Sequence, residues 1–147
     1  MRGRVVGGVS LCLLSIAVSA CALPSIAVRP SPTPTPDPIE VGQRVYLQLC
    51  AQCHGEEGEG YANELQAPAL DASEHAWHHP DQQIYEWVVF GKLGLGRQMP
   101  PQGDQLSDEE VYAMIAYLHT LWTPEQLATQ QDITNRWPAT PRPRSQP

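Results

Sequence analysis

The pentapeptide Cys50-Ala51-Gln52-Cys53-His54 constrains this chain of 147 residues more than any other feature of its sequence. The pattern C-x-x-C-H is the attachment signature of a c-type haem. Two thiols at this spacing can each add to one vinyl group of the same porphyrin, and the next imidazole then lies under the iron as an axial ligand. We therefore expect Cys50 and Cys53 to hold one haem covalently and His54 to bind its iron.

Two other kinds of site share part of this pattern. A zinc site needs about four ligands at recognised spacings, and the scattered histidines fit that poorly beside Cys50 and Cys53. A thioredoxin-like redox site also has C-x-x-C, but it is expected within a β-α-β pattern. No such pattern surrounds Cys50. A covalent haem therefore explains the motif best.

The first 20 residues have the organisation of an export signal. Arg2 and Arg4 form a positive start, and an apolar stretch interrupted by small residues follows. This stretch is too short and too interrupted for a transmembrane helix. The tetrapeptide VSAC at residues 18–21 resembles the lipobox of bacterial lipoproteins, whose cysteine is acylated and begins the mature chain. We predict a signal peptide over residues 1–20 and lipidation at Cys21.

Two alternatives to lipidation stay open, namely ordinary signal cleavage near residue 20 or 22 and an uncleaved N-terminal anchor. Cys12 would leave with a cleaved signal and Cys21 would carry lipid, so only two of the four cysteines remain for the folded part. A structural disulfide framework is thereby excluded, although an extracytoplasmic compartment would permit one.

Prolines dominate the segment that follows the signal. Six of them lie within residues 24–38, with serine or threonine between most of them. Proline fixes φ and lacks a backbone donor, so this segment cannot form a helical or sheet core. We expect an extended polyproline II conformation that rises about 3.1 Å per residue. Residues 21–38 are interpreted as a semi-rigid linker that lifts the domain off a membrane; a disordered stub is the alternative.

The remaining patterns indicate short helices. Asp37 and Pro38 form a helix start, and the apolar stripe that follows leads directly into Cys50. A second helix is expected from near residue 80 to residue 90. A third begins at the capping box formed by Ser107 and Glu110. A chain of about 85 residues buries only a modest core, so a haem would supply much of the apolar centre.

The predicted organisation is therefore an all-α domain over residues 39–122, with three to four short helices packed around one covalent haem. Residues 55–80 lack regular patterning, and a haem edge would organise them. Residues 123–147 are expected to form one short helix and a disordered C-terminal tail, because four prolines and two arginines follow residue 136.

Residues 42–118 resemble class I c-type cytochromes, and in particular the short single-haem domains of bacterial electron-transfer chains and terminal oxidase subunits. The resemblance implies the fold of that class and one haem c. Its motifs, in chain order, are Gly42-x-x-x-Tyr46, Cys50-x-x-Cys53-His54-Gly55, Ala67-Pro68-Ala69-Leu70, Met99-Pro100-Pro101 and Ile115-Ala116-Tyr117-Leu118.

The resemblance also implies roles for single residues. Gly42 and Tyr46 match the positions where the first helix crosses the last one at close range, and Tyr117 matches the aromatic residue that they meet. Pro68 matches a proline beside which a carbonyl accepts the second ring N–H of the haem-ligating histidine. Ala67 stands where the family usually has glycine.

Met99 matches the distal iron ligand of these cytochromes. A thioether is a soft ligand that raises the reduction potential relative to a second histidine. Core filling is the alternative role for a methionine, and it applies to Met114 on the last helix. His78 or His79 would be the distal ligand in a bis-histidine site.

The charge of the domain bears on its partners. Residues 39–122 hold thirteen acidic and three basic side chains, a formal charge of −10, whereas the whole chain has −7. Nucleic-acid binding is disfavoured, since phosphate contacts need Lys and Arg. We expect redox protein partners with a basic docking patch, steered to this surface by charge. An acidic surface that serves solubility alone is the alternative.

The sequence thus predicts an exported, membrane-tethered single-haem protein that passes one electron between respiratory or photosynthetic redox partners. With both axial positions of the iron filled, we expect an electron carrier without a small-molecule substrate rather than an enzyme. A cytochrome subunit bound permanently to a larger oxidoreductase is the first alternative. A haem enzyme or ligand sensor with a labile distal site is the second.

Overall fold

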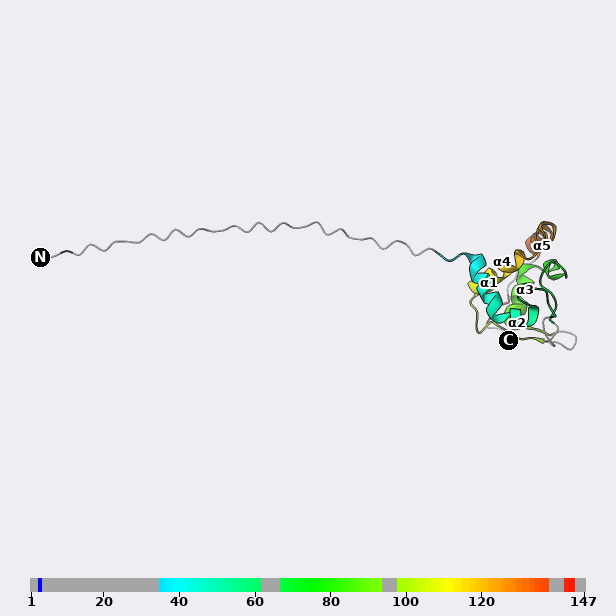
Figure 1. Ribbon diagram of the computed structural model, residues 1–147, viewed down its shortest axis with the longest axis horizontal. Helices are drawn as coiled ribbons and strands as arrows, with labels where there is room; N and C mark the ends of the chain where they lie inside the picture. The colour runs from blue at the N-terminus through cyan, green and yellow to red at the C-terminus, as the bar shows by residue number, and fades with distance from the viewer. Residues whose placement is uncertain (1–2, 4–34, 62–66, 94–97, 138–141, 145–147) are drawn as a thin grey trace. The chain divides into compact units, whose positions relative to one another are not determined.

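The computed structural model describes residues 3, 35–61, 67–93, 98–137 and 142–144 (Figure 1). The signal peptide, Cys12, Cys21 and nearly all of the proline-rich linker lie outside the described residues. The predictions made for these parts of the chain therefore stay predictions. Residues 34–147 form one unit, which holds the haem motif.

The prediction of a mainly helical domain is confirmed. Five α-helices and one short 3-10 helix account for most of the described residues after position 37, and no described helix has the length and apolarity to cross a membrane. In chain order the elements are α1 (Pro38–Leu49), α2 (Ala51–His54), η1 (Ala76–His78), α3 (Asp81–Phe90), β1 (Lys92–Leu93), β2 (Gln98–Met99), α4 (Asp108–His119) and α5 (Pro124–Arg136).

The helices begin where their sequence signals predict. At the start of α1 the Asp37 carboxylate accepts the N–H of Ile39 at 2.9 Å, and Pro38 occupies the first turn. At the start of α4 the capping box is complete, because Ser107 and Glu110 each accept the backbone N–H of the other. Such reciprocal caps satisfy backbone donors that a helix start leaves unpaired.

Helices α1 and α4 cross at very close range. A Cβ atom built on Gly42 would lie 2.0 Å from the carbonyl oxygen of Ala113, so only glycine fits this point of α1. Four residues further along, the rings of Tyr46 and Tyr117 meet with centroids 5.3 Å apart. The predicted crossing through Gly42, Tyr46 and Tyr117 is confirmed.

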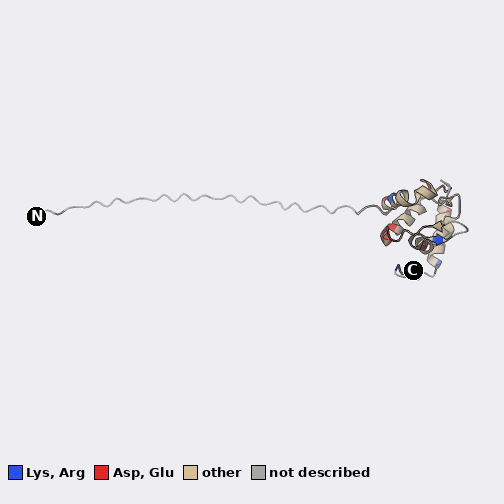
Figure 2. Ribbon diagram, turned by 90° about the horizontal axis from the view of Figure 1, so that it is seen from below, with Lys and Arg blue, Asp and Glu red and all other residues tan. Residues whose placement is uncertain are grey.

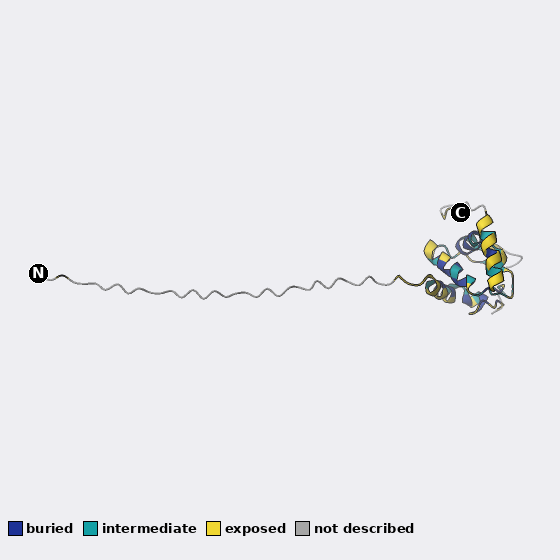
Figure 3. Ribbon diagram, turned by 90° about the horizontal axis from the view of Figure 1, so that it is seen from above, coloured by how far each residue is buried: buried dark blue, intermediate teal, exposed yellow. Residues whose placement is uncertain are grey.

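Figure 3 shows that the buried residues lie on the inner faces of the helices, while α5 is largely exposed. The core is formed mainly by α1, α3 and α4. Met114 on α4 is 2 % exposed and belongs to this core, as predicted.

The described residues include fifteen acidic and five basic side chains, which Figure 2 marks along the ribbon.

Beyond residue 122 the structure describes helix α5 and the short stretch over residues 142–144. Helix α5 has 13 residues and begins with a second capping box, Thr123 with Gln126. It contacts the segment around η1. Trp122, just before α5, donates its indole N–H to the carbonyl of Leu70 at 2.8 Å. Residues 142–144, expected within a disordered tail, contact α3 and α4 through arginine side chains.

Candidate functional site

The haem motif lies at the end of α1 and forms one further helical turn. Cys50 ends α1 with its N–H donated to the Tyr46 carbonyl at 2.8 Å, and α2 then carries Cys53 and His54. Residues three apart on a helix share a face, so the two cysteines lie on the same side. Gly55, with a φ of +83°, ends the turn. The motif is thereby held rigidly by the first helix.

The His54 ring is fixed by one hydrogen bond. Its Nδ1 donates to the carbonyl oxygen of Pro68 at 2.8 Å. A carbonyl can only accept, so Nδ1 carries the proton and Nε2 keeps its lone pair for a metal. The predicted bond at Pro68 is therefore present, and the acceptor is the carbonyl of Pro68 itself. His54 is 9 % exposed.

Backbone contacts hold the Pro68 segment against the motif. The N–H of Gly60 donates to the His54 carbonyl and the N–H of Tyr61 donates to the Ala67 carbonyl, each at 2.7 Å. A Cβ on Gly60 would lie 2.3 Å from the nitrogen of Ala69, so the two backbones approach more closely than any side chain allows. Alanine at position 67, where glycine is usual, takes part in this arrangement through its backbone.

An apolar cavity lies beside the motif. It brings together Cys50, His54 and Met99 from positions far apart in the chain. Cys53 is on the adjacent turn but is not among the lining residues. The remaining wall is mostly aliphatic or aromatic and consists of Leu70, Ala76, His79, Ile84, Trp87, Val88, Met114 and Leu118.

Met99 reaches this cavity from a two-residue strand. It lies in β2, opposite Lys92 of β1 in an antiparallel pair. Gly91, just after α3, has a φ of +76°, and a Cβ there would lie 2.7 Å from the Met99 carbonyl oxygen. The backbone of Met99 therefore packs tightly on the end of α3, and its partly buried side chain packs on the core.

These groups fit a c-type haem. Two thiols suit thioether attachment, an imidazole nitrogen and a thioether sulfur suit haem iron, and the apolar wall suits a porphyrin face. A family model described as cytochrome c oxidase, cbb3-type, subunit III, matches residues 37–118. The chain belongs to this cytochrome family. Its cofactor is a covalent haem c with iron, as in other cytochromes c.

Curated relatives agree with this cytochrome assignment. The FixP subunit of the cbb3-type cytochrome c oxidase of Sinorhizobium medicae is 32% identical over 89 residues, which are 56% of this chain and 30% of the relative. Cytochrome c550 of Pseudomonas aeruginosa is 31% identical over 90 residues, 59% of this chain and 58% of the relative. The chain thus spans less than a third of FixP and somewhat over half of cytochrome c550.

Among solved structures, one with a likeness to this chain is cytochrome cL of Hyphomicrobium denitrificans. It has a TM-score of 0.49 and 22% identity, and the alignment covers 68% of this cytochrome and 70% of the other chain. Cytochrome XoxG of Methylobacterium extorquens gives a TM-score of 0.48 at 21% identity, with 65% and 67% of the two chains covered.

His79 also lines the cavity of this cytochrome. The sequence did not distinguish His79 from His78 as a candidate ligand. The Nδ1 of His79 lies 2.8 Å from Oε1 of Gln83, and its ring packs edge-on against Trp87. Burial lowers the pKa of His79. His78 packs instead on Trp77 and does not line the cavity. Of the two histidine alternatives to Met99, only His79 has the position for it.

Burial also sets the electrostatics of the motif. It raises the pKa of the Cys50 thiol to about 11, with a smaller contribution from Cys53. Reactive redox cysteines have lowered pKa values, so the environment of Cys50 disfavours a thioredoxin-like role. Burial lowers the pKa of His54 despite the opposing hydrogen bond to Pro68, which favours the neutral, ligating imidazole. Across the described residues, no three His, Cys, Asp or Glu side chains cluster as a metal site.

One contact near the motif had no sequence signal. The Tyr46 hydroxyl donates to the carbonyl oxygen of Gly55 at 2.7 Å, and Tyr46 is fully buried. The resemblance assigned Tyr46 to the helix crossing alone. The structure shows that the same side chain also fastens the end of the haem motif to α1.

Proposed function

We propose that this protein is an exported, single-haem electron-transfer protein. In this proposal Cys50 and Cys53 hold the haem, while His54 and Met99 bind the iron from opposite sides. The observation that carries the proposal is the single cavity onto which Cys50, His54 and Met99 converge, with the His54 ring oriented by Pro68. When bound, the haem supplies a one-electron Fe(II)/Fe(III) couple.

Particular residues of the chain retain the haem, orient its ligand and exclude water from it. Cys50 and Cys53 prevent loss of the cofactor by dissociation. The carbonyl of Pro68 orients the imidazole and increases its basicity as a ligand. The aliphatic wall excludes water, and the thioether of Met99 favours the reduced state. With two protein ligands on the iron no position is open for a substrate, which supports an electron carrier rather than an enzyme.

The charge of the domain supports a partner with a basic docking patch. Acidic side chains outnumber basic ones by about three to one among the described residues (Figure 2). Glu56, Glu57 and Glu59 directly follow the motif, and all three are exposed. Charge of this sign steers a positive partner toward the domain at rates that fall as salt rises.

A tether to the outer face of the cell membrane belongs to the same proposal. The apolar start of the chain, the VSAC tetrapeptide and the proline-rich residues 21–38 support export followed by lipidation at Cys21. Replacement of Cys21 by Ser is expected to release the haem protein from the membrane fraction, whereas Cys12→Ser leaves it bound. Release of neither variant, or of both, would contradict lipidation at Cys21.

A second candidate function is a subunit that stays bound to a larger oxidoreductase. The family model and the FixP relatives, both named for cbb3-type cytochrome c oxidase, favour this candidate. Gentle detergent purification of the native protein separates the two functions. Co-elution with oxidase subunits supports the bound subunit, and elution of the lone cytochrome supports the free carrier.

Absorption spectra of the purified holoprotein test the assignment of the iron ligands. The oxidised wild type is expected to show the long-wavelength band of thioether-to-iron ligation, and Met99→Ala is expected to lose it. Met114→Leu is the matched control, because Met114 lines the same cavity from α4. Loss of the band in Met114→Leu but not in Met99→Ala would refute ligation by Met99. A wild-type spectrum of the bis-histidine type that changes on His79→Ala substitution would refute it as well.

A further inference from the structure

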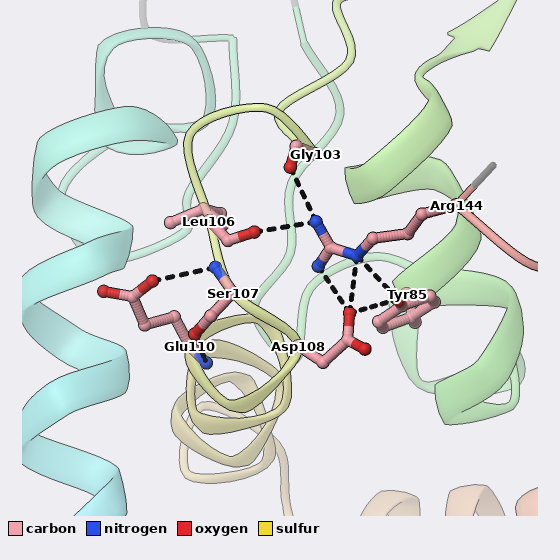
Figure 4. Close-up of polar contacts among 7 residues, drawn as sticks. All are labelled: Tyr85, Gly103, Leu106, Ser107, Asp108, Glu110 and Arg144. Atoms are coloured by element: carbon pink, nitrogen blue, oxygen red, sulfur yellow. Dashed lines mark hydrogen bonds and ion pairs between the residues drawn. The ribbon is translucent and has the colours of Figure 1, made fainter.

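The C-terminal residues 142–144 return to the domain and pack against two helices and a connecting segment. The Arg142 guanidinium lies 3.6 Å from the centre of the Phe90 ring at the end of α3. Arg144 reaches the start of α4, as Figure 4 shows. We call residues 142–144 the C-terminal strap. It lies well beyond residue 118, where the match to the family model ends.

Arg144 makes hydrogen bonds to three parts of the fold. Its Nη1 donates to the carbonyl oxygens of Gly103 at 2.6 Å and Leu106 at 2.8 Å. Its Nε and Nη2 lie 2.6 and 2.5 Å from Oδ1 of Asp108, in the first turn of α4. The Nε is also 3.3 Å from the Tyr85 hydroxyl, which donates to the same carboxylate oxygen at 2.5 Å.

The two carbonyls belong to the segment that directly follows Met99. Residues 100–107 connect β2 to α4, and Gly103 follows Met99 by four positions. The segment is also attached to α3, because Gln102 and Gly103 donate their N–H groups to the carbonyls of Val88 and Val89. A displacement of Met99 away from the cavity must therefore disturb contacts on both sides of this segment.

An isolated surface ion pair contributes little to stability, but Arg144 does not form one. Its guanidinium holds two backbone carbonyls and a carboxylate at once, and hydrogen bonds from a charged donor are about twice as strong as neutral ones. The bond to the Leu106 carbonyl is partly buried, whereas the bonds to Gly103 and Asp108 are exposed. Arg144 thus joins α3, α4 and the segment behind Met99.

We propose that Arg144 is a positioning residue for Met99, and that the C-terminal strap suppresses local opening of the segment over residues 100–107. This inference rests on the proposed role of Met99 as an iron ligand. Local opening with a small free-energy cost is common in segments held by few contacts. The strap raises that cost without touching the iron or the cavity wall.

Exogenous imidazole measures this opening in the oxidised, full-length holoprotein. Imidazole can take the position of Met99 only when the segment has opened, so its apparent affinity increases with the open fraction. Loss of the thioether band on imidazole titration gives the dissociation constant. Arg144→Gln is expected to tighten imidazole binding roughly tenfold, the effect of losing hydrogen bonds from a charged donor.

Two further variants make the test specific. Arg136→Gln removes an equal charge from an exposed pair with Asp132 on α5, away from the segment, and should leave the imidazole affinity within about twofold. Arg144→Lys keeps the charge but loses the planar fork that reaches both carbonyls. It should tighten imidazole binding as well, and it supplies the measurement where the Gln variant does not fold.

The outcomes separate this inference from the proposed function. A wild type with the thioether band and Arg144 variants that bind imidazole like Arg136→Gln would overturn the inference alone. The inference would also be overturned if the Arg144 variants lowered the denaturant midpoint of global unfolding but left the imidazole affinity unchanged. A wild type without the thioether band would overturn the assignment of Met99, and the role of Arg144 with it.

Discussion

The Tyr46 hydroxyl donates a 2.7 Å hydrogen bond to the carbonyl oxygen of Gly55, and so joins α1 to the residue that follows His54 in the C-x-x-C-H motif. Burial is the main cause of the raised pKa of Tyr46, so the hydroxyl keeps its proton and remains a donor. The ring of Tyr46 packs on Tyr117 of α4. One side chain thus links the haem motif to the crossing of the two principal helices.

Removal of the Tyr46 hydroxyl should destabilise the folded protein. Tyr46→Phe leaves the Gly55 carbonyl without its buried donor, and the free energy of unfolding of the holoprotein is expected to fall by about 1–3 kcal/mol. Denaturant titration followed by helical circular dichroism measures the change. Tyr112→Phe, on a ring that is 45 % exposed, is the control and should have little effect. Equal effects of the two substitutions would contradict a special role for the Tyr46 hydroxyl.

Enlarging Gly42 should disrupt the helix crossing. Gly42→Ala places a methyl group 2.0 Å from the Ala113 carbonyl oxygen, so α1 and α4 must move apart. The expected loss of stability is about 1–3 kcal/mol or more, as for overpacked cores, despite the better helix propensity of alanine. Gln43→Ala on the exposed side of α1 is the matched control. A Gly42→Ala holoprotein as stable as this control would show that the crossing tolerates separation.

Asp108 should contribute to the acid sensitivity of the protein. The hydrogen bond from Tyr85, followed by those from Arg144, lowers the pKa of Asp108. The folded protein therefore holds this proton less strongly than the unfolded chain. The resulting stabilisation is present above about pH 4, the ordinary value for Asp, and is lost as the pH falls through the lowered pKa.

Asp108→Asn tests this dependence, because the variant has no such titration. Its free energy of unfolding should decline less steeply than that of the wild type as the pH falls below about 4. Asp104→Asn, an exposed carboxylate of the same connecting segment, serves as the control and should follow the wild-type curve. If the free energies of unfolding of Asp108→Asn and the wild type fell equally as the pH was lowered, the contribution of Asp108 would be disproved.

The buried Gln130 of α5 should stabilise the cavity wall. Its Nε2 lies within hydrogen-bond distance of the His79 carbonyl (3.2 Å), Asp81 Oδ1 (2.6 Å) and Thr134 Oγ1 (2.9 Å), while its Oε1 is buried without a hydrogen-bond partner among the described residues. Gln130→Leu removes this donor from three partly buried acceptors, so we expect a loss of about 1–3 kcal/mol in unfolding free energy. Thermal or denaturant unfolding of the holoprotein measures it.

The neighbouring Gln131 provides the control for that substitution. It has the same side chain on the exposed face of α5, so Gln131→Leu changes the hydropathy of the helix without removing a buried bond. A variant at position 130 that unfolds at the same denaturant concentration as the one at position 131 would mean that the Gln130 contacts contribute nothing measurable.

Local signals in the sequence were sufficient for much of the fold and of the candidate site. The caps at Asp37 and Ser107 act over two or three residues, and a close helix crossing favours a glycine such as Gly42. The C-x-x-C-H motif is itself a local pattern. Its link to Pro68 and Met99 came from the order of motifs in a known family, because no physical property of either segment alone points to the other.

Contacts between distant polar side chains had no comparable signal. The Nε2 of His119, at the end of α4, lies 3.0 Å from Asp81 Oδ1, 38 positions away. Gln130 and Arg144 likewise bond to residues tens of positions distant. Such pairings depend on where the packed helices place each side chain, and the surrounding sequence of an isolated Gln or Arg contains nothing that specifies its partner.

The position of α5 and the strap after the cytochrome domain has a consequence for biosynthesis. A polypeptide is made from its N-terminus, and its early segments begin to fold first. Cys50 and Cys53 therefore leave the ribosome before Trp122, Gln130 and Arg144 are synthesised. Those later side chains complete the wall near residues 70–79 and the segment behind Met99. We therefore expect Cys50 and Cys53 to be accessible for haem attachment before α5 and residues 142–144 pack on the domain.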